Sequence, residues 1–183
     1  MSNKKIRITV VGDGDTGKTS ILIAYKDKTF NDTYTPTVFD SYSMDIPIFN
    51  EIYHIILYDT AGQEDFDRLR RFAYKDTDVF ILCYAINNPD SYYNIKDKWV
   101  PELRALKPNT KIILTGTKSD LKRMSGSITT EEGQTLAKQI KADGFLECSA
   151  KNMINIEQTF QTAFLRAVKV DRKNKQKGHC VML

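Results

Sequence analysis

The chain has 183 residues, of which 41% are hydrophobic and 27% charged, which predicts one soluble globular domain with a single sizeable core. No apolar run approaches the roughly 20 residues of a membrane span, and the first residues lack the apolar core of a signal peptide, so we expect a cytosolic protein. The net charge of +4 is uneven, because lysines and arginines crowd the C-terminus. The three cysteines and two histidines form neither a disulfide framework nor a zinc-ligand cluster.

The first predicted element is a strand at residues 6–11, which leads into a glycine loop at residues 12–19 and then a helix. The loop, GDGDTGKT, has the spacing G-x-x-x-x-G-K-[ST], and its glycines let the backbone fold into a phosphate-binding nest of N–H groups. Lys18 is placed to reach the β- and γ-phosphates, and the Thr19 hydroxyl to ligate Mg²⁺. The alternative is a glycine-rich turn that binds nothing. The candidate phosphate-binding residues are Gly14, Asp15, Thr16, Gly17, Lys18, Thr19 and Ser20.

Strand-like and helix-like segments alternate along the rest of the chain. Strands are predicted at 41–48, 52–58, 79–85, 111–115 and 145–148, the first two as a hairpin. Helices are predicted from Pro89 with a kink at Pro101, from Thr130 behind a capping box to about residue 142, and from about residue 155. The expected buried stripe of the helix that begins at Pro89 is Tyr92, Ile95, Trp99, Leu103 and Leu106.

This order of segments predicts an α/β fold. We expect a six-stranded, mostly parallel sheet with one antiparallel edge strand and about five helices on both faces. In such sheets ligands bind beyond the carboxyl ends of the strands, so the chemistry is expected in the loops after residues 11, 58, 116 and 148.

The loop after residue 58 carries the residues expected to act on a γ-phosphate. Asp59, at a strand end, suits indirect coordination of Mg²⁺ through water. Gly62 is placed to offer a backbone N–H close to the phosphate, and Gln63 to orient an attacking water. Taken alone, Asp-x-x-Gly is a common turn, and its position after a phosphate loop is what favours the functional interpretation.

The loops after residues 116 and 148 carry the residues expected to recognise a base. The Asp120 carboxylate is suited to accept from N1–H and the exocyclic amine of guanine, a donor pair that adenine lacks. The Lys118 stem is suited to pack on the ring plane, next to Thr117. Backbone amides of Ser149, Ala150 and Lys151 are candidates to bind the guanine carbonyl oxygen. The alternative is that both are simply polar loops at strand ends.

The motifs GDGDTGKT, DTAGQE, TKSD and SAK, in this order, resemble those of small GTPases of the Ras superfamily, and residues 34–43 and 63–70 resemble the Rho branch. The resemblance covers essentially the whole chain and implies a P-loop GTPase domain at 1–171 that binds GTP or GDP with Mg²⁺. It implies that Thr37 bonds Mg²⁺ and the γ-phosphate, that Phe30 packs against guanine and that Tyr34 lines the nucleotide site. Lys18, Thr37 and Gln63 would be catalytic. Residues 30–42 and 60–76 would be the two switch segments.

Three departures from the Rho pattern qualify this resemblance. The segment between Asp120 and Thr129 is too short for the extra helix that Rho proteins usually insert there. Asp15 replaces a small apolar residue, and we expect its charge to weaken nucleotide retention and alter hydrolysis unless the side chain points outward. Tyr58 replaces a Trp or Phe that helps to select exchange factors, so the resemblance does not indicate which exchange factor acts on this chain.

The sequence also predicts how hydrolysis is controlled. No arginine lies between Arg7 and Arg68, so we expect slow intrinsic hydrolysis that a partner's arginine accelerates. The resemblance implies a monomer that works with exchange factors, activating proteins, a Rho-type dissociation inhibitor and GTP-state effectors of the actin cytoskeleton, and not with nucleic acid. A metabolic phosphotransferase is one alternative, but no lid rich in arginine is evident. A nucleotide-locked scaffold is another, which Asp15 favours and Gln63 opposes.

The end of the chain, Cys180-Val181-Met182-Leu183, is a C-a-a-X motif whose final leucine favours geranylgeranylation of Cys180. One lipid anchors only marginally, and the basic residues of the predicted flexible tail at 172–183 would add attraction to anionic lipid. These features predict anchoring at the cytoplasmic face of the plasma membrane. The alternatives for the basic residues are a solvated tail or a nuclear or nucleic-acid patch. The basic residues are Arg172, Lys173, Lys175 and Lys177.

Overall fold

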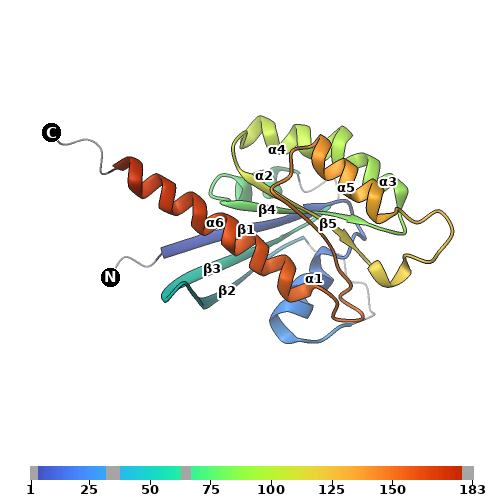
Figure 1. Cartoon of the computed structure of the whole chain (residues 1–183), viewed down its shortest axis with the longest axis horizontal. Helices are drawn as coiled ribbons and strands as arrows, with labels where there is room; N and C mark the ends of the chain where they lie inside the picture. Colours follow the sequence, from blue (N-terminus) through green and yellow to red (C-terminus); the bar gives the residue numbers. More distant parts are fainter. Residues whose placement is uncertain (1–3, 32–37, 63–66, 179–183) are drawn as a thin grey trace.

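The structure is a computed structural model, and it describes residues 4–31, 38–62 and 67–178, with only the backbone given at residue 67 and at 169–178. A six-stranded sheet has the strand order β2-β3-β1-β4-β5-β6, in which β2 is antiparallel to β3 and all other pairs are parallel. The predicted α/β fold with one antiparallel edge strand is therefore confirmed (Figure 1). The strands are β1 (Lys4–Gly12), β2 (Phe39–Ile48), β3 (Glu51–Thr60), β4 (Val79–Ala85), β5 (Lys111–Thr117) and β6 (Gly144–Glu147).

Helices cover both faces of the sheet and enclose two apolar clusters. α1 and α6 bury one cluster, which includes Tyr25 and Phe160, whose rings stack with centroids 4.3 Å apart. The second cluster lies beneath α3, η2, α4 and α5 and includes Trp99 and Leu136. The helices are α1 (Lys18–Asp27), α2 (Asp67–Tyr74), α3 (Pro89–Asn94), the π-helical turn η2 (Ile95–Trp99), α4 (Val100–Leu106), the 3-10 turn η3 (Ser119–Leu121), α5 (Thr130–Gln139) and α6 (Ile156–Gly178).

The central strand β4 is buried at every position, as expected for a parallel strand covered on both faces. Its Cys83 and the nearby Cys148 are both free and fully buried thiols. Burial raises the pKa of the Cys148 thiol to about 12, so this side chain stays protonated and behaves as a small apolar group.

A π-helical turn, η2, ends two positions before Pro101, where the sequence predicts a kink. The helix begins as expected, because Asn88 accepts a hydrogen bond from the Ser91 N–H and Pro89 occupies the first turn. Within η2 the wider turn accommodates the missing N–H of Pro101 and rotates the following residues. Leu106 is consequently 44% exposed, and its predicted place in the buried stripe is wrong, whereas Ile95, Trp99 and Leu103 are buried.

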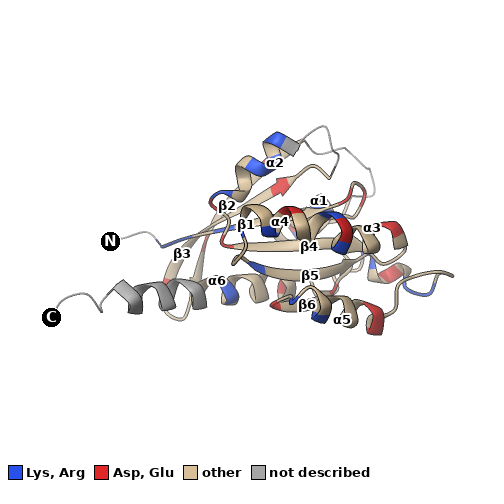
Figure 2. Ribbon diagram, turned by 90° about the horizontal axis from the view of Figure 1, so that it is seen from above, with Lys and Arg blue, Asp and Glu red and all other residues tan. Residues whose placement is uncertain are grey.

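Two segments differ from the sequence prediction. α2 was not predicted, because arginines interrupt its apolar pattern; Figure 2 shows the basic residues along this helix. α6 continues to Gly178, into the expected flexible tail, and its end projects beyond the sheet (Figure 1). Residues 172–177 contain no proline or glycine, and extending an existing helix avoids the cost of nucleation. No helix in the described residues is long and apolar enough to cross a bilayer.

Candidate nucleotide site

The phosphate loop joins β1 to α1 through residues in unusual backbone conformations. Gly17 has a φ of 78°, and Asp15, which is not a glycine, has a φ of 57°. At Gly12 a Cβ would lie 2.2 Å from the carbonyl oxygen of Cys83 on β4, so only glycine fits where the loop leaves the sheet. The sequence expectation of a tightly folded glycine loop between strand and helix therefore agrees with the structure.

Lys18 lies within this loop and is only 6% exposed. Its Nζ donates to the backbone oxygen of Asp13 at 2.6 Å. Burial lowers the pKa of Lys18, and the nearby carboxylates of Asp59 and Asp13 oppose that shift. The ammonium is thus held at the centre of the loop, close to where phosphate oxygens would accept its hydrogen bonds.

The two described residues expected at a metal ion come from neighbouring elements. Asp59 is fully buried near the carboxyl end of β3, in register with Val10 of β1, and Thr19 follows Lys18 in α1. The adjacent Thr60 hydroxyl donates to the Val10 carbonyl at 2.8 Å, which fixes the end of β3 beside the loop. A hydroxyl and a carboxylate are hard oxygen donors, and this donor set fits Mg²⁺.

Gly62 brings the segment after β3 into contact with the phosphate loop. A Cβ there would lie 2.3 Å from the backbone nitrogen of Gly14, so no other residue fits without displacing the loop. This contact agrees with the predicted place of Gly62 beside the phosphates. Its predicted neighbours Gln63, Thr37 and Tyr34 lie outside the described residues, as does Cys180.

Nine of the predicted residues line a cavity of about 240 Å³ next to the phosphate loop, whereas Gly14, Thr16 and Ser149 are not part of its lining. They come from the phosphate loop, from the first turn of α1, from residue 30, and from the end of β5 and the loops after β5 and β6, which the sheet places side by side. Phe30 is 36% exposed at its edge. The predicted residues that line the cavity are Asp15, Gly17, Ser20, Phe30, Thr117, Lys118, Asp120, Ala150 and Lys151.

Hydrogen bonds join the loops that form this cavity. The Thr117 hydroxyl donates to the carbonyl oxygens of Thr16 and Tyr84, at 2.5 and 3.0 Å. The Ser149 hydroxyl donates to Asp120 Oδ1, and the Asn152 N–H donates to Ser149 Oγ at 3.1 Å. The fully buried Ser149 side chain therefore orients the Asp120 carboxylate, a role that the sequence did not predict.

Asp15 points away from the phosphate loop. Its side chain is 72% exposed, and Oδ1 lies 3.0 Å from Nζ of Lys118. The sequence predicts weaker nucleotide retention only where this side chain points inward, and the structure has it pointing outward. The carboxylate consequently acts on the lysine expected to cover the base.

The sequence did not identify Trp99 and Arg70 as parts of the site. The indole Nε1 of Trp99 donates to Asp13 Oδ1 at 2.8 Å, and the Arg70 guanidinium lies 4.8 Å from the centre of the Trp99 ring. Helical periodicity assigned Trp99 to the core, and no local pattern marks a hydrogen bond to a residue 86 positions away.

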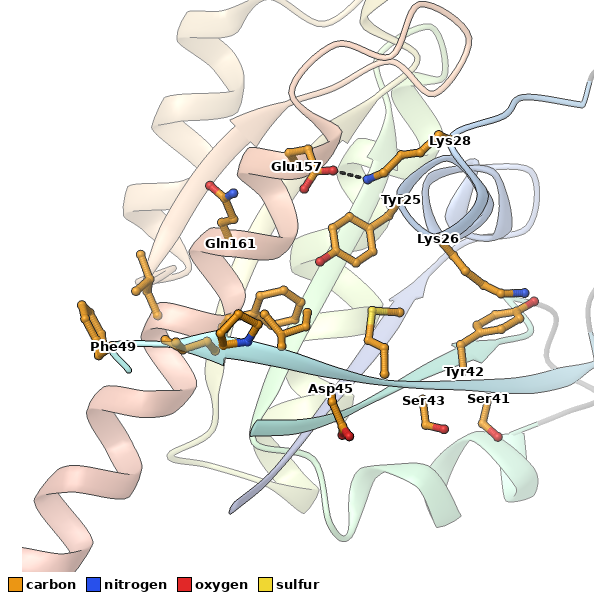
Figure 3. A pocket seen from close by; sticks show the side chains of 16 residues that line it. Tyr25, Lys26, Lys28, Ser41, Tyr42, Ser43, Asp45, Phe49, Glu157 and Gln161 are labelled. Atoms are coloured by element: carbon orange, nitrogen blue, oxygen red, sulfur yellow. Dashed lines mark hydrogen bonds and ion pairs between the residues drawn. The ribbon is translucent and has the colours of Figure 1, made fainter. Parts of the chain in front are cut away.

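A larger groove of about 910 Å³ lies apart from the nucleotide cavity, between the end of α1, strand β2 and α6 (Figure 3). Lys28 and Glu157 form an ion pair at its rim, and Nζ of Lys26 lies 4.8 Å from the Tyr42 ring. None of its lining residues is among the predicted nucleotide ligands.

Comparison with known proteins points to the same chemistry. The sequence profile of the Ras family matches residues 7–169. The chain is also 42% identical, over 184 aligned positions, to the Ras-like GTP-binding protein RhoL of Drosophila melanogaster. That alignment covers 100% of this chain and 96% of the relative.

Proposed function

The chain belongs to the Ras family of GTP-binding proteins, and we propose that within this family it is a Rho-type switch that engages effectors in its GTP-bound state. As a member of the family it binds GTP and GDP with Mg²⁺ and hydrolyses GTP. The observation that carries the proposal is the cavity in which Asp120, Lys118 and Phe30 meet beside the phosphate loop. A phosphate loop alone would serve many nucleotides, whereas this cavity adds an acceptor group for guanine.

Guanine recognition rests on the orientation of one carboxylate. Ser149 holds Asp120 through Oδ1, and the cavity lies in front of it. A carboxylate in this place accepts hydrogen bonds from the two donors of the guanine edge. Adenine presents an acceptor at N1, so an adenine nucleotide would leave the half-buried Asp120 carboxylate without its N1–H donor and bind weakly.

Hydrolysis is proposed to proceed by in-line attack of a water oriented by Gln63. Lys18 and the loop N–H groups would stabilise the charge that develops on the phosphates. Mg²⁺ would neutralise charge on the β- and γ-phosphate oxygens, with Thr19, Asp59 and Thr37 as its protein partners. The sequence supplies no arginine between Arg7 and Arg68, so a partner must add one for fast turnover.

The Rho assignment is supported by residues 34–43 and by the similarity to RhoL of Drosophila melanogaster. Between Leu121 and Thr130 the chain forms turns, and no helix occurs in this described stretch. Partners that grip an inserted helix are therefore not expected. Tyr58 stacks on Phe39, with ring centroids 5.7 Å apart. This tyrosine presents a different surface to an exchange factor than the Trp that many Rho proteins have at this position.

We further propose that the C-terminus anchors the switch to the cytoplasmic face of the plasma membrane. Geranylgeranylation of Cys180 would supply one signal and the basic residues at 172–177 a second, through anionic lipid. Exchange factors, activating proteins, a dissociation inhibitor and effectors of actin are the proposed partners. Mass spectrometry of the protein from its own cells tests the anchor: prenylation with loss of the last three residues is expected, and an intact free C-terminus contradicts it.

Single-turnover GTP hydrolysis, with and without a Rho-type activating protein, tests the switch. We expect slow hydrolysis by the chain alone and an acceleration of roughly 10³–10⁵ by the activating protein. Fast hydrolysis alone contradicts the proposal. Failure to hydrolyse under either condition identifies a nucleotide-locked scaffold, and transfer of the γ-phosphate to a small acceptor identifies a phosphotransferase.

A further inference from the structure

Trp99 is the single tryptophan of the chain and is fully buried at the end of the π-helical turn η2. Its Nε1 donates to Asp13 Oδ1 at 2.8 Å, and the side-chain amide of Asn94 donates to Asp13 Oδ2 at 2.7 Å. Both carboxylate oxygens of this phosphate-loop residue are thus held from the helix that follows β4. Hydrogen bonds to a charged acceptor are about twice as strong as neutral ones, so this attachment is firm.

The backbone of Asp13 in turn holds the phosphate loop in shape. Its carbonyl oxygen accepts from Nζ of Lys18 at 2.6 Å and from the Thr16 hydroxyl at 2.8 Å. A displacement of the Asp13 side chain would therefore move the atom that positions the phosphate-binding lysine. Only Asp13 therefore separates the Trp99 indole from the phosphate-binding Lys18.

The face of the same indole contacts α2. The Arg70 guanidinium carbon lies 4.8 Å from the ring centre, and the Arg70 side chain is fully buried. Arg70 Nη1 donates to the carbonyl oxygen of Ala61 at 3.0 Å, directly before Gly62. Glu102 lies 3.3 Å from Arg70 Nε and accepts from the Tyr74 hydroxyl at 2.9 Å, which fixes the guanidinium over the ring.

We propose that Trp99 is a positioning residue that couples the phosphate loop to α2. Its N–H edge fixes Asp13 and, through Asp13, Lys18; its face fixes Arg70 and, through Arg70, the Ala61-Gly62 segment. A change at either side alters the packing of the one ring that both sides share. The inference goes beyond the proposed switch, because it assigns a link between two parts of the site to a residue that touches no nucleotide.

The π-helical turn is what makes this contact available. The Val100 N–H donates to the Ile95 carbonyl, the five-residue spacing of a π turn, two positions before Pro101. The added residue per turn rotates Trp99 relative to the α-helical register of α3. Such turns cost helix stability and often occur at functional sites, in agreement with a role beyond filling the core.

The decisive variant is Trp99→Phe, which keeps an aromatic ring beneath Arg70 and removes the N–H. We expect nucleotide release to become about tenfold faster and single-turnover GTP hydrolysis to become slower, because a charge-assisted hydrogen bond to Asp13 is lost. Tyr93→Phe is the matched control, since it also removes one polar hydrogen, from a residue of α3 that is 60% exposed and lies six positions before Trp99. Both rates should be unchanged in that control.

The fluorescence of the wild-type chain distinguishes coupling from simple core packing. If Trp99 only filled the core, its emission would not depend on the bound nucleotide. Because Trp99 is the sole tryptophan, emission excited at the indole band reports on this ring alone. We expect its intensity or wavelength to differ between the GDP form and a form loaded with a non-hydrolysable GTP analogue. The difference should vanish in Arg70→Leu.

Both results are required for the proposal. Rates in Trp99→Phe within twofold of wild type overturn it, whatever the emission shows. Emission that is identical in the two nucleotide states also overturns it, since altered rates would then follow from a loosened core. Thermal unfolding of each variant with bound GDP establishes how much folded protein contributes to each rate.

Discussion

The carboxylate of Asp15 in the phosphate loop lies 3.0 Å from the ammonium of Lys118 in the loop after β5. Lys118 is the residue whose stem is expected to cover the base, and Asp15 has a positive φ of 57° that directs its side chain toward it. One acidic residue thereby connects the phosphate-binding and base-binding parts of the site. The Asp15 side chain is 72% exposed, whereas that of Lys118 is 27% exposed and lines the cavity, so the ion pair joins a solvent-facing group to the base-binding part.

We predict that Asp15→Asn slows the release of GDP. The amide keeps the shape and tolerates the left-handed backbone, but it loses the charge that holds the Lys118 ammonium, so the lysine stem becomes free to pack on the base. An exposed ion pair contributes at most about 1 kcal/mol, so the expected change is up to about fivefold. Release of a fluorescent GDP analogue measures it.

Salt provides the control for this prediction. At about 1 M ionic strength exposed charges are screened within a few ångströms, so the difference between wild type and Asp15→Asn should largely disappear. Equal release rates at low salt would show that Asp15 does not influence retention. Asp15→Ala should change release in the same direction, with added strain at the positive φ.

We predict that Asp120→Asn exchanges guanine for xanthine. The amide still accepts from N1–H, but its NH₂ group opposes the exocyclic amine of guanine and suits the carbonyl of xanthine. One hydrogen bond to a charged acceptor is lost, and two donor groups, the new NH₂ and the exocyclic amine, face each other. We expect GTP binding to weaken by roughly 10²-fold. Equilibrium binding of GDP and xanthosine diphosphate measures the exchange. Unchanged GDP affinity would place the base elsewhere.

We predict that Gly62→Ala distorts the phosphate loop. The new Cβ would lie 2.3 Å from Asp13 and Gly14 backbone atoms, which cannot move independently. Overpacking of this kind costs about 1–3 kcal/mol of unfolding free energy and should weaken nucleotide binding as well. Gly126→Ala is the contrast: it has a positive φ of 79° but no atom within 4 Å of the added Cβ. That variant should lose about 1 kcal/mol of stability and keep its affinity.

We predict a pH-dependent contribution from the capping box of α5. Hydrogen bonds from the Thr129 N–H and hydroxyl lower the pKa of Glu132 below its usual 4.5. A lowered folded-state pKa adds stability above the unfolded pKa, and this stability is lost as the pH falls through the folded value. Glu132→Ala should therefore destabilise at pH 7 and cost progressively less in acid.

The control for the capping box is Glu131→Ala. Glu131 stands in the same first turn and loses the same interaction with the helix dipole, but it is not the capping-box residue. Urea unfolding of both variants between pH 3 and 7 separates the two effects. If Glu131→Ala and Glu132→Ala follow the same curve, the capping bonds contribute nothing beyond the dipole.

Much of the fold could be predicted because its strongest signals are local. The all-buried run Val79–Ala85 gave β4 its correct bounds, and the capping box placed the start of α5. The sequence does not predict α2, because its residue Arg70 is a fully buried charge. The burial of Arg70 depends on Glu102, 32 positions away. Periodicity of apolar residues does not detect a core position filled by arginine.

Some residues of the candidate site can be predicted from local motifs, and others depend on contacts between distant parts of the chain. Gly62, Lys118 and Asp120 were found because short motifs at strand ends carry their own spacing. The hydrogen bond of Trp99 to Asp13 was not, because it depends on a π-helical turn and on how the helix crosses the loop. The orientation of Asp15 likewise needed the three-dimensional position of Lys118.

The short strand β6 has a consequence for the lifetime of the bound state. It spans only Gly144–Glu147, lies at the edge of the sheet and pairs with β5 alone, yet it leads into Ser149, which orients Asp120. Fraying of this edge would release the base-reading carboxylate while the rest of the sheet stays intact. A bound guanine nucleotide therefore holds β6 and the loop that follows it against β5. Amide exchange at residues 144–149 should slow on loading and follow the rate at which nucleotide departs.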